Sequence, residues 1–207
     1  MDLDAALARP GLEPALRLQV LAAVAAVGAD WALLRAVATR ARALGSPRQD
    51  LEETLLQAVL FCGFPRIVTA FEELTAAWPA AVPPTGGALP REHQAGAGEA
   101  LFATIYGRHA DAVHDLLRLL HGELHDFVLE AAYGRILTRP HLDGRQRELL
   151  AVAMLAASAQ PRQFTSHARG ARHLGATREQ LEQVVQTVFE AAAAGEGAAA
   201  TWLQRLA

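Results

Sequence analysis

The segment ARALGSPRQDLE at Ala41–Glu52 returns as ARHLGATREQLE at Ala171–Glu182, 130 residues further along the chain. In each copy an apolar stretch with helical spacing ends at a glycine, a short turn follows, and a charged segment comes next. Glycine after the last apolar residue is a usual helix stop signal, and Ser-Pro or Thr before a charged first turn is a usual start signal. The segment therefore predicts the same helix–turn–helix unit twice in one chain.

The likeness extends beyond this segment. The same offset aligns Arg17–Glu53 with Arg147–Gln183 without a gap, and 12 of the 37 aligned pairs are identical. Five of these pairs are alanines, which carry little weight in so alanine-rich a chain. The other seven are Arg17/Arg147, Arg42/Arg172, Leu44/Leu174, Gly45/Gly175, Arg48/Arg178, Leu51/Leu181 and Glu52/Glu182. A fixed offset over this length indicates an internal duplication.

Apolar residues recur at helical spacing through most of the chain, and alanine and leucine outnumber the residues that favour strands. The predicted helices are Leu16–Val27, Trp31–Leu44, Leu51–Phe61, Ile67–Trp78, Glu99–Tyr106, Ala110–Leu120, Leu124–Leu137, Arg145–Ala157, Arg162–Leu174, Arg178–Ala193 and Ala198–Leu206. Proline and glycine crowd the stretch between residues 79 and 98, which predicts a connection. We therefore expect an all-α fold of two tandem related helical units, at 1–80 and 98–207, joined by a linker at 81–97.

Composition and charge exclude several classes of protein. Hydrophobic residues make up 52% of the chain and charged residues 20%, which is a globular balance. The net charge of −3 and the scattered arginines give no support for a nucleic-acid partner. The expected protein is cytoplasmic, because the acidic, proline-broken N-terminus does not resemble a signal peptide and no apolar run reaches the roughly 18–20 residues of a membrane span. The single cysteine, Cys62, excludes an internal disulfide and is expected to be a small buried apolar residue.

The two copies differ at positions that matter for chemistry. Glu148 in the second copy aligns with Leu18 in the first, and His167 aligns with Val37. Each titratable residue thus has an apolar counterpart. The difference predicts that the first copy is kept for packing and the second for a reaction. The alternatives are that His167 is an ordinary helix histidine and that Glu148 is a helix-start glutamate favoured by the helix dipole.

The second copy resembles the carboxymuconolactone decarboxylase family. The resemblance rests on YGRILTRPHLDGRQRE at Tyr133–Glu148, HARGA at 167–171 and LGATRE at 174–179. In the first copy, Leu51-Glu-Glu53 and the turn FCGFP at 61–65 are similar to the family's acidic helix start and the turn that follows it. The resemblance implies an AhpD-like helical orthogonal bundle, with a complete unit over 98–207 and a truncated, inactive unit over 1–80.

One branch of this family consists of alkylhydroperoxidases, whose pattern is E-x11-C-x2-C-x3-H. Here the spacing is kept, but glutamines replace both cysteines, at Glu148, Gln160, Gln163 and His167. Thiol–disulfide chemistry requires a thiolate and a resolving thiol, and Cys62 lies in the other copy. A peroxidase activity of that type is therefore disfavoured.

The decarboxylase branch implies the cofactor-free loss of CO2 from γ-carboxymuconolactone or a related small carboxylated acid. In that interpretation His167 is the proton donor and Glu148 its orienting or relay partner. Arg139 or Arg147 would hold a substrate carboxylate, and Gln163, one turn before His167, would hydrogen-bond substrate. A non-catalytic, oligomeric binding module is the remaining alternative.

The remaining histidines and tyrosines of the second copy are expected to have structural roles. The histidines His114, His121 and His125 are candidate metal ligands, but HGELH at 121–125 has its glutamate one position too late for an HExxH motif. We therefore expect no metal, and expect these histidines to lie at a surface or a subunit contact. Tyr106 and Tyr133 each precede a glycine and are expected to pack at helix ends, with lining the pocket as the alternative. The resemblance also implies an assembly, because single-unit members of that family form hexameric rings, and three two-unit chains would form the same ring as a homotrimer.

Overall fold

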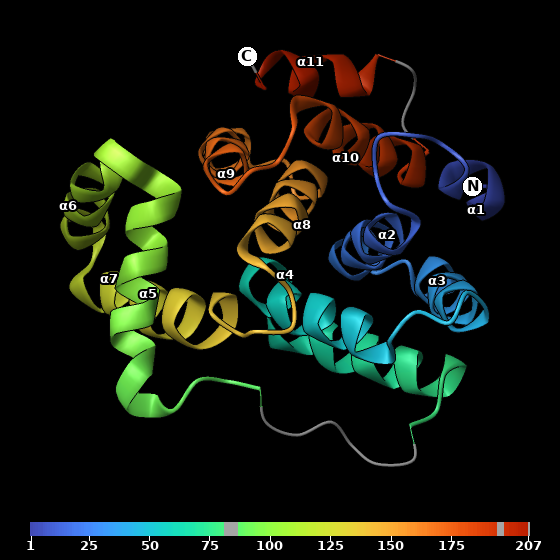
Figure 1. The fold of residues 1–207 in the computed structure, drawn as a ribbon, viewed down its shortest axis with the longest axis horizontal. Helices are drawn as coiled ribbons and strands as arrows, with labels where there is room; N and C mark the ends of the chain where they lie inside the picture. Colours follow the sequence, from blue (N-terminus) through green and yellow to red (C-terminus); the bar gives the residue numbers. More distant parts are fainter. Residues whose placement is uncertain (81–86, 194–196, 207) are drawn as a thin grey trace.

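The computed structural model describes residues 1–80, 87–193 and 197–206, and within these ranges it contains helices and no strand (Figure 1). The helices are α1 Leu3–Leu7, α2 Pro14–Gly28, α3 Trp31–Ala43, α4 Arg48–Ala77, α5 Arg91–Tyr106, the 3-10 turn η1 Gly107–His109, α6 Ala110–Leu120, α7 Gly122–Phe127, the π-helix η2 Val128–Leu137, α8 Gly144–Ala157, α9 Pro161–His173, α10 Arg178–Ala191 and α11 Ala198–Gln204. The all-α prediction is confirmed.

The duplication is visible in the helix bounds and in the backbone. α2, α3 and the start of α4 coincide with α8, α9 and α10 at the offset of 130 residues. The helix ends match as well, since Ala29 and Ala159 have φ of 56° and 55°, and Gly45 and Gly175 have φ of 71° and 91°. Residues with positive φ end many helices, and glycine adopts that conformation without strain.

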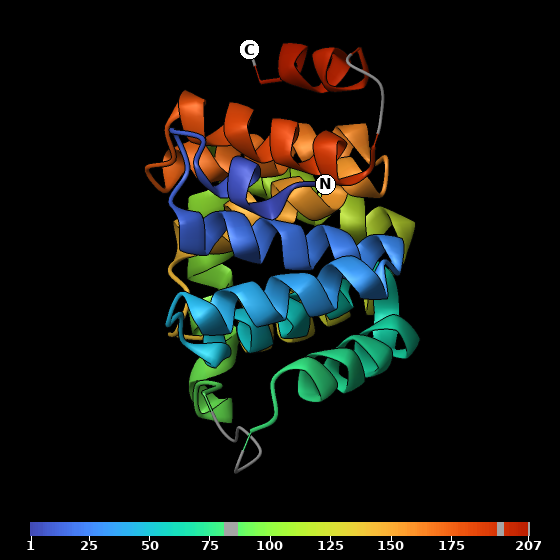
Figure 2. The same cartoon turned by 90° about the vertical axis from the view of Figure 1, so that its right-hand side faces the viewer.

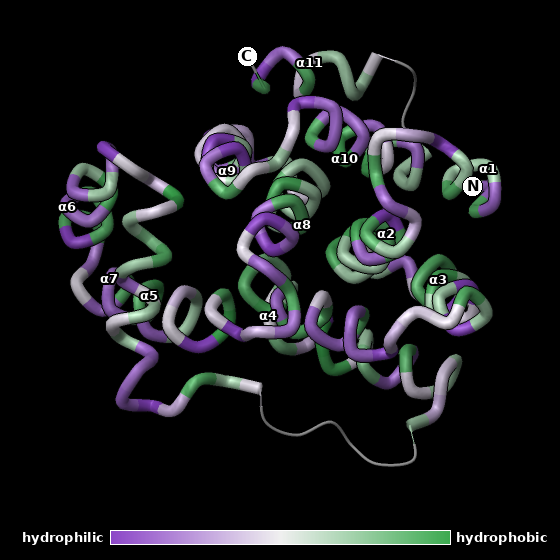
Figure 3. Tube along the Cα trace, in the orientation of Figure 1, coloured by the Kyte–Doolittle hydropathy of each residue, from purple (hydrophilic) through white to green (hydrophobic). Residues whose placement is uncertain are grey.

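The two units share one hydrophobic core. α2 packs against α8 and α10, and Figure 2 shows α2 between α10 and α3. Every residue of Leu16–Val27 and of Arg147–Ala156 is buried, and the hydropathy colouring shows how apolar α2 is (Figure 3). Burial of an entire helical stretch rather than one face indicates a central position in a bundle. The first copy is thus part of the core against which the second copy packs.

α4 consists of two helices joined at Gly63, as the sequence predicts. Gly63 has φ 75° and ψ 169°, which no helix contains, and Pro65 follows in the next turn. By length and composition alone α4 could cross a membrane. The break divides it into segments of about 15 residues, shorter than the roughly 20 that a span requires. We therefore interpret α4 as two helices of the bundle.

The second unit carries an arm that the first lacks. α5 begins at Arg91, inside the segment expected to be linker, and packs with η2 in a second hydrophobic cluster. In Figure 1 this arm, α5 to α7, stands on the left of the bundle. The offset of 130 residues aligns α1, Leu3–Leu7, with residues 133–137 at the end of η2. The residues of α5 to α7 have no equivalent in the first unit.

Candidate active site

Arg147 and Glu148 are neighbours on α8, but their side chains leave the helix in different directions. α8 starts at a capping box in which Asp143 and Gln146 bond each other's backbone N–H groups. Successive residues of an α-helix are rotated by about 100°. Arg147 consequently reaches α4, whereas Glu148 reaches α9. Both residues are 1% exposed, so each needs a partner inside the protein.

The structure brings Glu148 and His167 together. Nδ1 of His167 lies 2.9 Å from Oε2 of Glu148, across the packed pair α8 and α9. His167 keeps 13% of its side-chain surface exposed, and its Nε2 makes no hydrogen bond within the described residues. The second oxygen of Glu148, Oε1, is buried and also lacks a partner among the described residues. Buried polar atoms without a partner are uncommon and are found at functional sites.

Gly170 makes room for this carboxylate. A Cβ atom at position 170 would lie 2.6 Å from Oε2 of Glu148 and 2.6 Å from Cγ2 of Ile105. Both distances are far below van der Waals contact, so any larger residue would displace the carboxylate or α5. In the first copy, where no carboxylate is present, the aligned residue is Arg40. Gly170 is therefore a residue of the site that the sequence analysis missed, although the alignment of the copies contained this signal.

Two tyrosines lie beside the pair. The hydroxyl of Tyr133 on η2 donates a hydrogen bond of 3.1 Å to the hydroxyl of Tyr106 at the end of α5. The rings of Tyr106 and His167 are 6.4 Å apart, centre to centre, in an edge-on arrangement. Phe102 packs against both tyrosine rings, at 4.5 and 4.9 Å. Tyr106 ends α5, as the helix-end interpretation expects, whereas Tyr133 lies inside η2.

The electrostatics favour a protonated imidazole. Burial lowers the pKa of His167, but the negative charge of Glu148 and the hydrogen bond to it outweigh burial, and the pKa lies above its usual value. Burial also raises the pKa of Tyr133 well above its usual range, and Tyr106 and Glu148 raise it further. Burial and Glu148 raise the pKa of Tyr106, against a smaller opposing effect of its bond to Tyr133. Both hydroxyls therefore keep their protons at neutral pH.

The raised pKa predicts how stability depends on pH. The folded pKa of His167 exceeds its unfolded value of about 6.5, so the pair stabilises the fold fully below that pH and ceases to do so as pH rises through the folded pKa. We expect Glu148→Gln to lower the thermal midpoint more at pH 6 than at pH 9, measured by circular dichroism. A difference that is constant with pH, or larger at pH 9, would contradict a charged pair.

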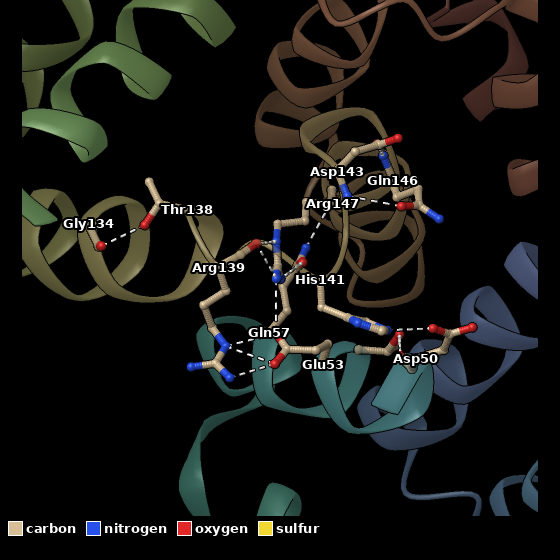
Figure 4. A network of polar contacts seen from close by, with 11 residues as sticks. Asp50, Glu53, Gln57, Gly134, Thr138, Arg139, His141, Asp143, Gln146 and Arg147 are labelled. Carbon is tan, nitrogen blue, oxygen red and sulfur yellow. Dashed lines mark hydrogen bonds and ion pairs between the residues drawn. The ribbon is translucent and has the colours of Figure 1, made fainter. Parts of the chain in front are cut away.

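The two arginines proposed as substrate anchors lie elsewhere. Figure 4 shows Arg139 and Arg147 converging on Glu53 of α4. Arg139 donates to both carboxylate oxygens at 2.6–3.0 Å, and Nη2 of Arg147 donates to Oε2 at 2.9 Å. Arg147 also bonds Gln57, whose amide donates to its carbonyl oxygen at 2.8 Å. These guanidinium groups join the two units, and we remove them from the candidate site.

The first copy uses its own arginines in the same way. Arg17, the counterpart of Arg147, is fully buried and donates to Thr187 of α10 at 2.8 Å. It also donates to the carbonyl of Arg9 at 3.1 Å, just as Arg147 donates to the carbonyl of Arg139 at 3.0 Å. Each unit thus sends an arginine across to the third helix of the other. Because both copies keep this arginine and its contacts, we assign Arg17 and Arg147 a structural role.

The remaining candidate residues are peripheral or paired. Gln163 and Gln160 are exposed, and the amide of Gln160 donates to a backbone carbonyl two residues away. Cys62 is half-buried, and its thiol donates to the carbonyl of Ala58 at 3.2 Å. Burial raises the pKa of Cys62, against a smaller opposing effect of Arg66, so the thiol is not activated.

The expectation of a surface position is wrong for two of the three histidines. His114 and His125 are buried and lie 3.0 Å apart between Nδ1 and Nε2. Their outer nitrogens face Glu99 and Asp126, at 3.1 and 2.8 Å. Within the described ranges no three His, Cys, Asp or Glu side chains are placed to hold a metal ion. This chain of contacts ties α5, α6 and α7 together.

The fold and the site define a two-unit, all-helical protein in which Glu148 and His167 form a buried carboxylate–imidazole pair. The model of the carboxymuconolactone decarboxylase family matches residues 1–76 and 122–206, which is most of the chain. The chain belongs to this family, and the resemblance noted in the sequence is confirmed. No match is found among curated proteins. The matched segments contain Glu148, His167 and Tyr133, but not Tyr106.

Proposed function

We propose that the protein is a cofactor-free decarboxylase of a small carboxylated lactone, with His167 as proton donor and Glu148 as its partner. The observation that carries this proposal is the buried contact of 2.9 Å between the two side chains. Nδ1 of the imidazole faces the carboxylate, so Nε2 is left as the nitrogen for substrate. A carboxylate on one ring nitrogen fixes the orientation and tautomer of the other.

The reaction needs one proton and no redox partner. The bond between the substrate and its carboxylate breaks, CO2 leaves, and the electron pair of that bond moves into the conjugated lactone. Nε2–H of His167 then protonates the resulting carbanion at carbon, and water restores the proton on the imidazole. A positioned general acid of this kind contributes about 10²–10⁴ in rate. The raised pKa of His167 supports the proposal, because the contact with Glu148 favours the protonated form that a proton donor requires.

Thiol chemistry finds less support in this chain. The two positions that carry cysteine in the alkylhydroperoxidase branch are the exposed glutamines Gln160 and Gln163. The lone thiol, Cys62, has a raised pKa and belongs to the first unit. A disulfide-based cycle would require a resolving thiol that the sequence does not contain.

The direct test is incubation of the purified protein with γ-carboxymuconolactone. We expect loss of lactone absorbance with one CO2 released per lactone consumed, and, in D2O, one deuterium bound to carbon in each product molecule. Turnover should not require added metal, nucleotide or thiol. Absence of CO2 release above the rate in buffer would overturn the proposal in favour of a binding role or another substrate.

A further inference from the structure

The arm of the second unit approaches η2 unusually closely. A Cβ atom on Gly98 of α5 would lie 2.7 Å from the backbone nitrogen of Gly134. A Cβ atom on Gly134 would lie 3.0 Å from the carbonyl oxygen of Gln94. Because neither glycine has a side chain, the two helices meet backbone to backbone. This crossing brings Tyr106, near the end of α5, next to Tyr133, the residue before Gly134.

Tyr133 lies on ten residues of π-helix, Val128–Leu137. A π-helix is rare, and short π segments are found frequently at functional sites. Tyr133 is 3% exposed, and its hydroxyl donates to the oxygen of Tyr106. A phenol that accepts one hydrogen bond still has its own proton to donate. Within the described residues the hydroxyl of Tyr106 has no acceptor for that proton.

The ring of Tyr106 lies beside that of the proposed acid. The ring of Tyr106 is 6.4 Å from the ring of His167, and the charge of Glu148 acts on both tyrosine hydroxyls. The arginines expected to face an anionic substrate are held by Glu53 instead. A decarboxylation also needs a donor for the oxygen on which negative charge develops.

We propose that the hydroxyl of Tyr106 donates a hydrogen bond to the oxygen of the lactone on which charge develops, and that Tyr133 positions it through the hydroxyl–hydroxyl contact. This inference rests on the proposed function. As CO2 leaves, the electron pair moves toward the carbonyl oxygen of the lactone, and the O–H of Tyr106 stabilises it without giving up its proton. When His167 protonates carbon, the charge returns from oxygen and the bond to Tyr106 weakens. Tyr106 is therefore a catalytic residue and Tyr133 a positioning residue.

The test is a set of phenylalanine variants assayed on γ-carboxymuconolactone. Loss of one oxyanion donor typically lowers kcat about 10²–10³-fold, which we expect for Tyr106→Phe with little change in KM. Tyr133→Phe should lower kcat by about tenfold, since water or rotation partly replaces the orienting bond. Because Tyr133 acts through Tyr106, the double variant should be no slower than Tyr106→Phe alone. Thr54→Val, which removes a buried hydroxyl on α4, is the matched control and should keep wild-type kcat.

A merely structural role gives a different pattern. If the two tyrosines had only a structural role, both single variants would have lower thermal midpoints. Their kcat per folded molecule would equal that of the wild type. That pattern would overturn the inference, as would a double variant whose loss of kcat equals the product of the two single losses. If Tyr106→Phe fails to fold, a Tyr133→Phe protein with wild-type kcat would have the same consequence.

A binding measurement separates this inference from the proposed function. Furan-2,5-dicarboxylate is a planar, unreactive dicarboxylate with a five-membered oxygen ring, and its binding can be measured by calorimetry. A hydrogen bond to a charged group predicts binding at least about tenfold weaker in Tyr106→Phe than in the wild type. If the wild type releases no CO2 but this difference is found, the decarboxylase proposal fails and Tyr106 remains an anion donor. Equal or undetectable binding in both proteins, together with equal kcat, would overturn the role of Tyr106.

Discussion

Replacing His167 by asparagine should lower kcat for γ-carboxymuconolactone by about 10²–10⁴, the usual contribution of a positioned general acid. Asparagine is smaller than histidine and can still hydrogen-bond Glu148, but it cannot release a proton near neutral pH. We therefore expect a folded protein whose KM changes little. The rate is measured by loss of lactone absorbance under saturating substrate.

The control for this variant is His93→Gln, on the exposed side of α5, which should retain wild-type kcat. If His167→Asn turned over lactone as fast as the wild type, His167 would not be the proton donor. A matched decrease in the His93→Gln protein would show instead that the assay reports general damage to the fold.

Replacing Glu53 by alanine should destabilise the protein by about 3–5 kcal/mol, the cost of leaving a buried charge without its partner. Glu53 is 4% exposed and accepts hydrogen bonds from Arg139 and Arg147, the second of which is 1% exposed. In the variant, Arg147 keeps only neutral acceptors. Urea unfolding followed by circular dichroism measures the change.

A less buried ion pair provides the comparison. Glu73 pairs with Arg35 on the surface between α4 and α3, and such pairs contribute about 0–1 kcal/mol. Glu73→Ala should therefore change stability by less than about 1 kcal/mol. A Glu53→Ala protein as stable as Glu73→Ala would show that the crossed arginines do not hold the units together.

The contacts of Glu53 with Arg139 and Arg147 should also determine how stability changes at low pH. Burial raises the pKa of Glu53, but the hydrogen bonds and charges of Arg139 and Arg147 outweigh it and hold the pKa below its usual value. The stabilisation is therefore present above the unfolded pKa and is lost as pH falls through the folded one.

Much of the fold could be predicted because its signals are local. Helix stops at Gly45 and Gly175, and the break at Gly63, are encoded in single residues whose backbone conformation excludes helix. The start of α5 was hidden, because its first turns carry the glycines Gly96 and Gly98 and few apolar residues. Gly98 allows α5 to cross η2 closely at Gly134. Such a contact between helices has no signal in the local sequence.

The site was only partly predictable. Comparing the copies predicted Glu148 and His167 as candidates, because each has an apolar counterpart in the other copy, and the structure places the two side chains 2.9 Å apart. The same comparison should have excluded Arg147, since Arg17 occupies the equivalent place and makes the equivalent contact. Tyr106 could not be found this way, because α5 has no counterpart in the first copy.

The proposed source of the proton is the buried Glu148–His167 pair, and the pH dependence of kcat/KM tests this role most directly. A general acid is active when protonated, so the wild-type rate should be high at low pH and fall as pH passes the raised pKa of His167. In Glu148→Gln, burial still lowers the pKa of His167, but the attraction of the imidazolium to the carboxylate is lost. The pKa should therefore decrease, and the fall in rate should occur at lower pH. A profile that is identical in both proteins would contradict the account.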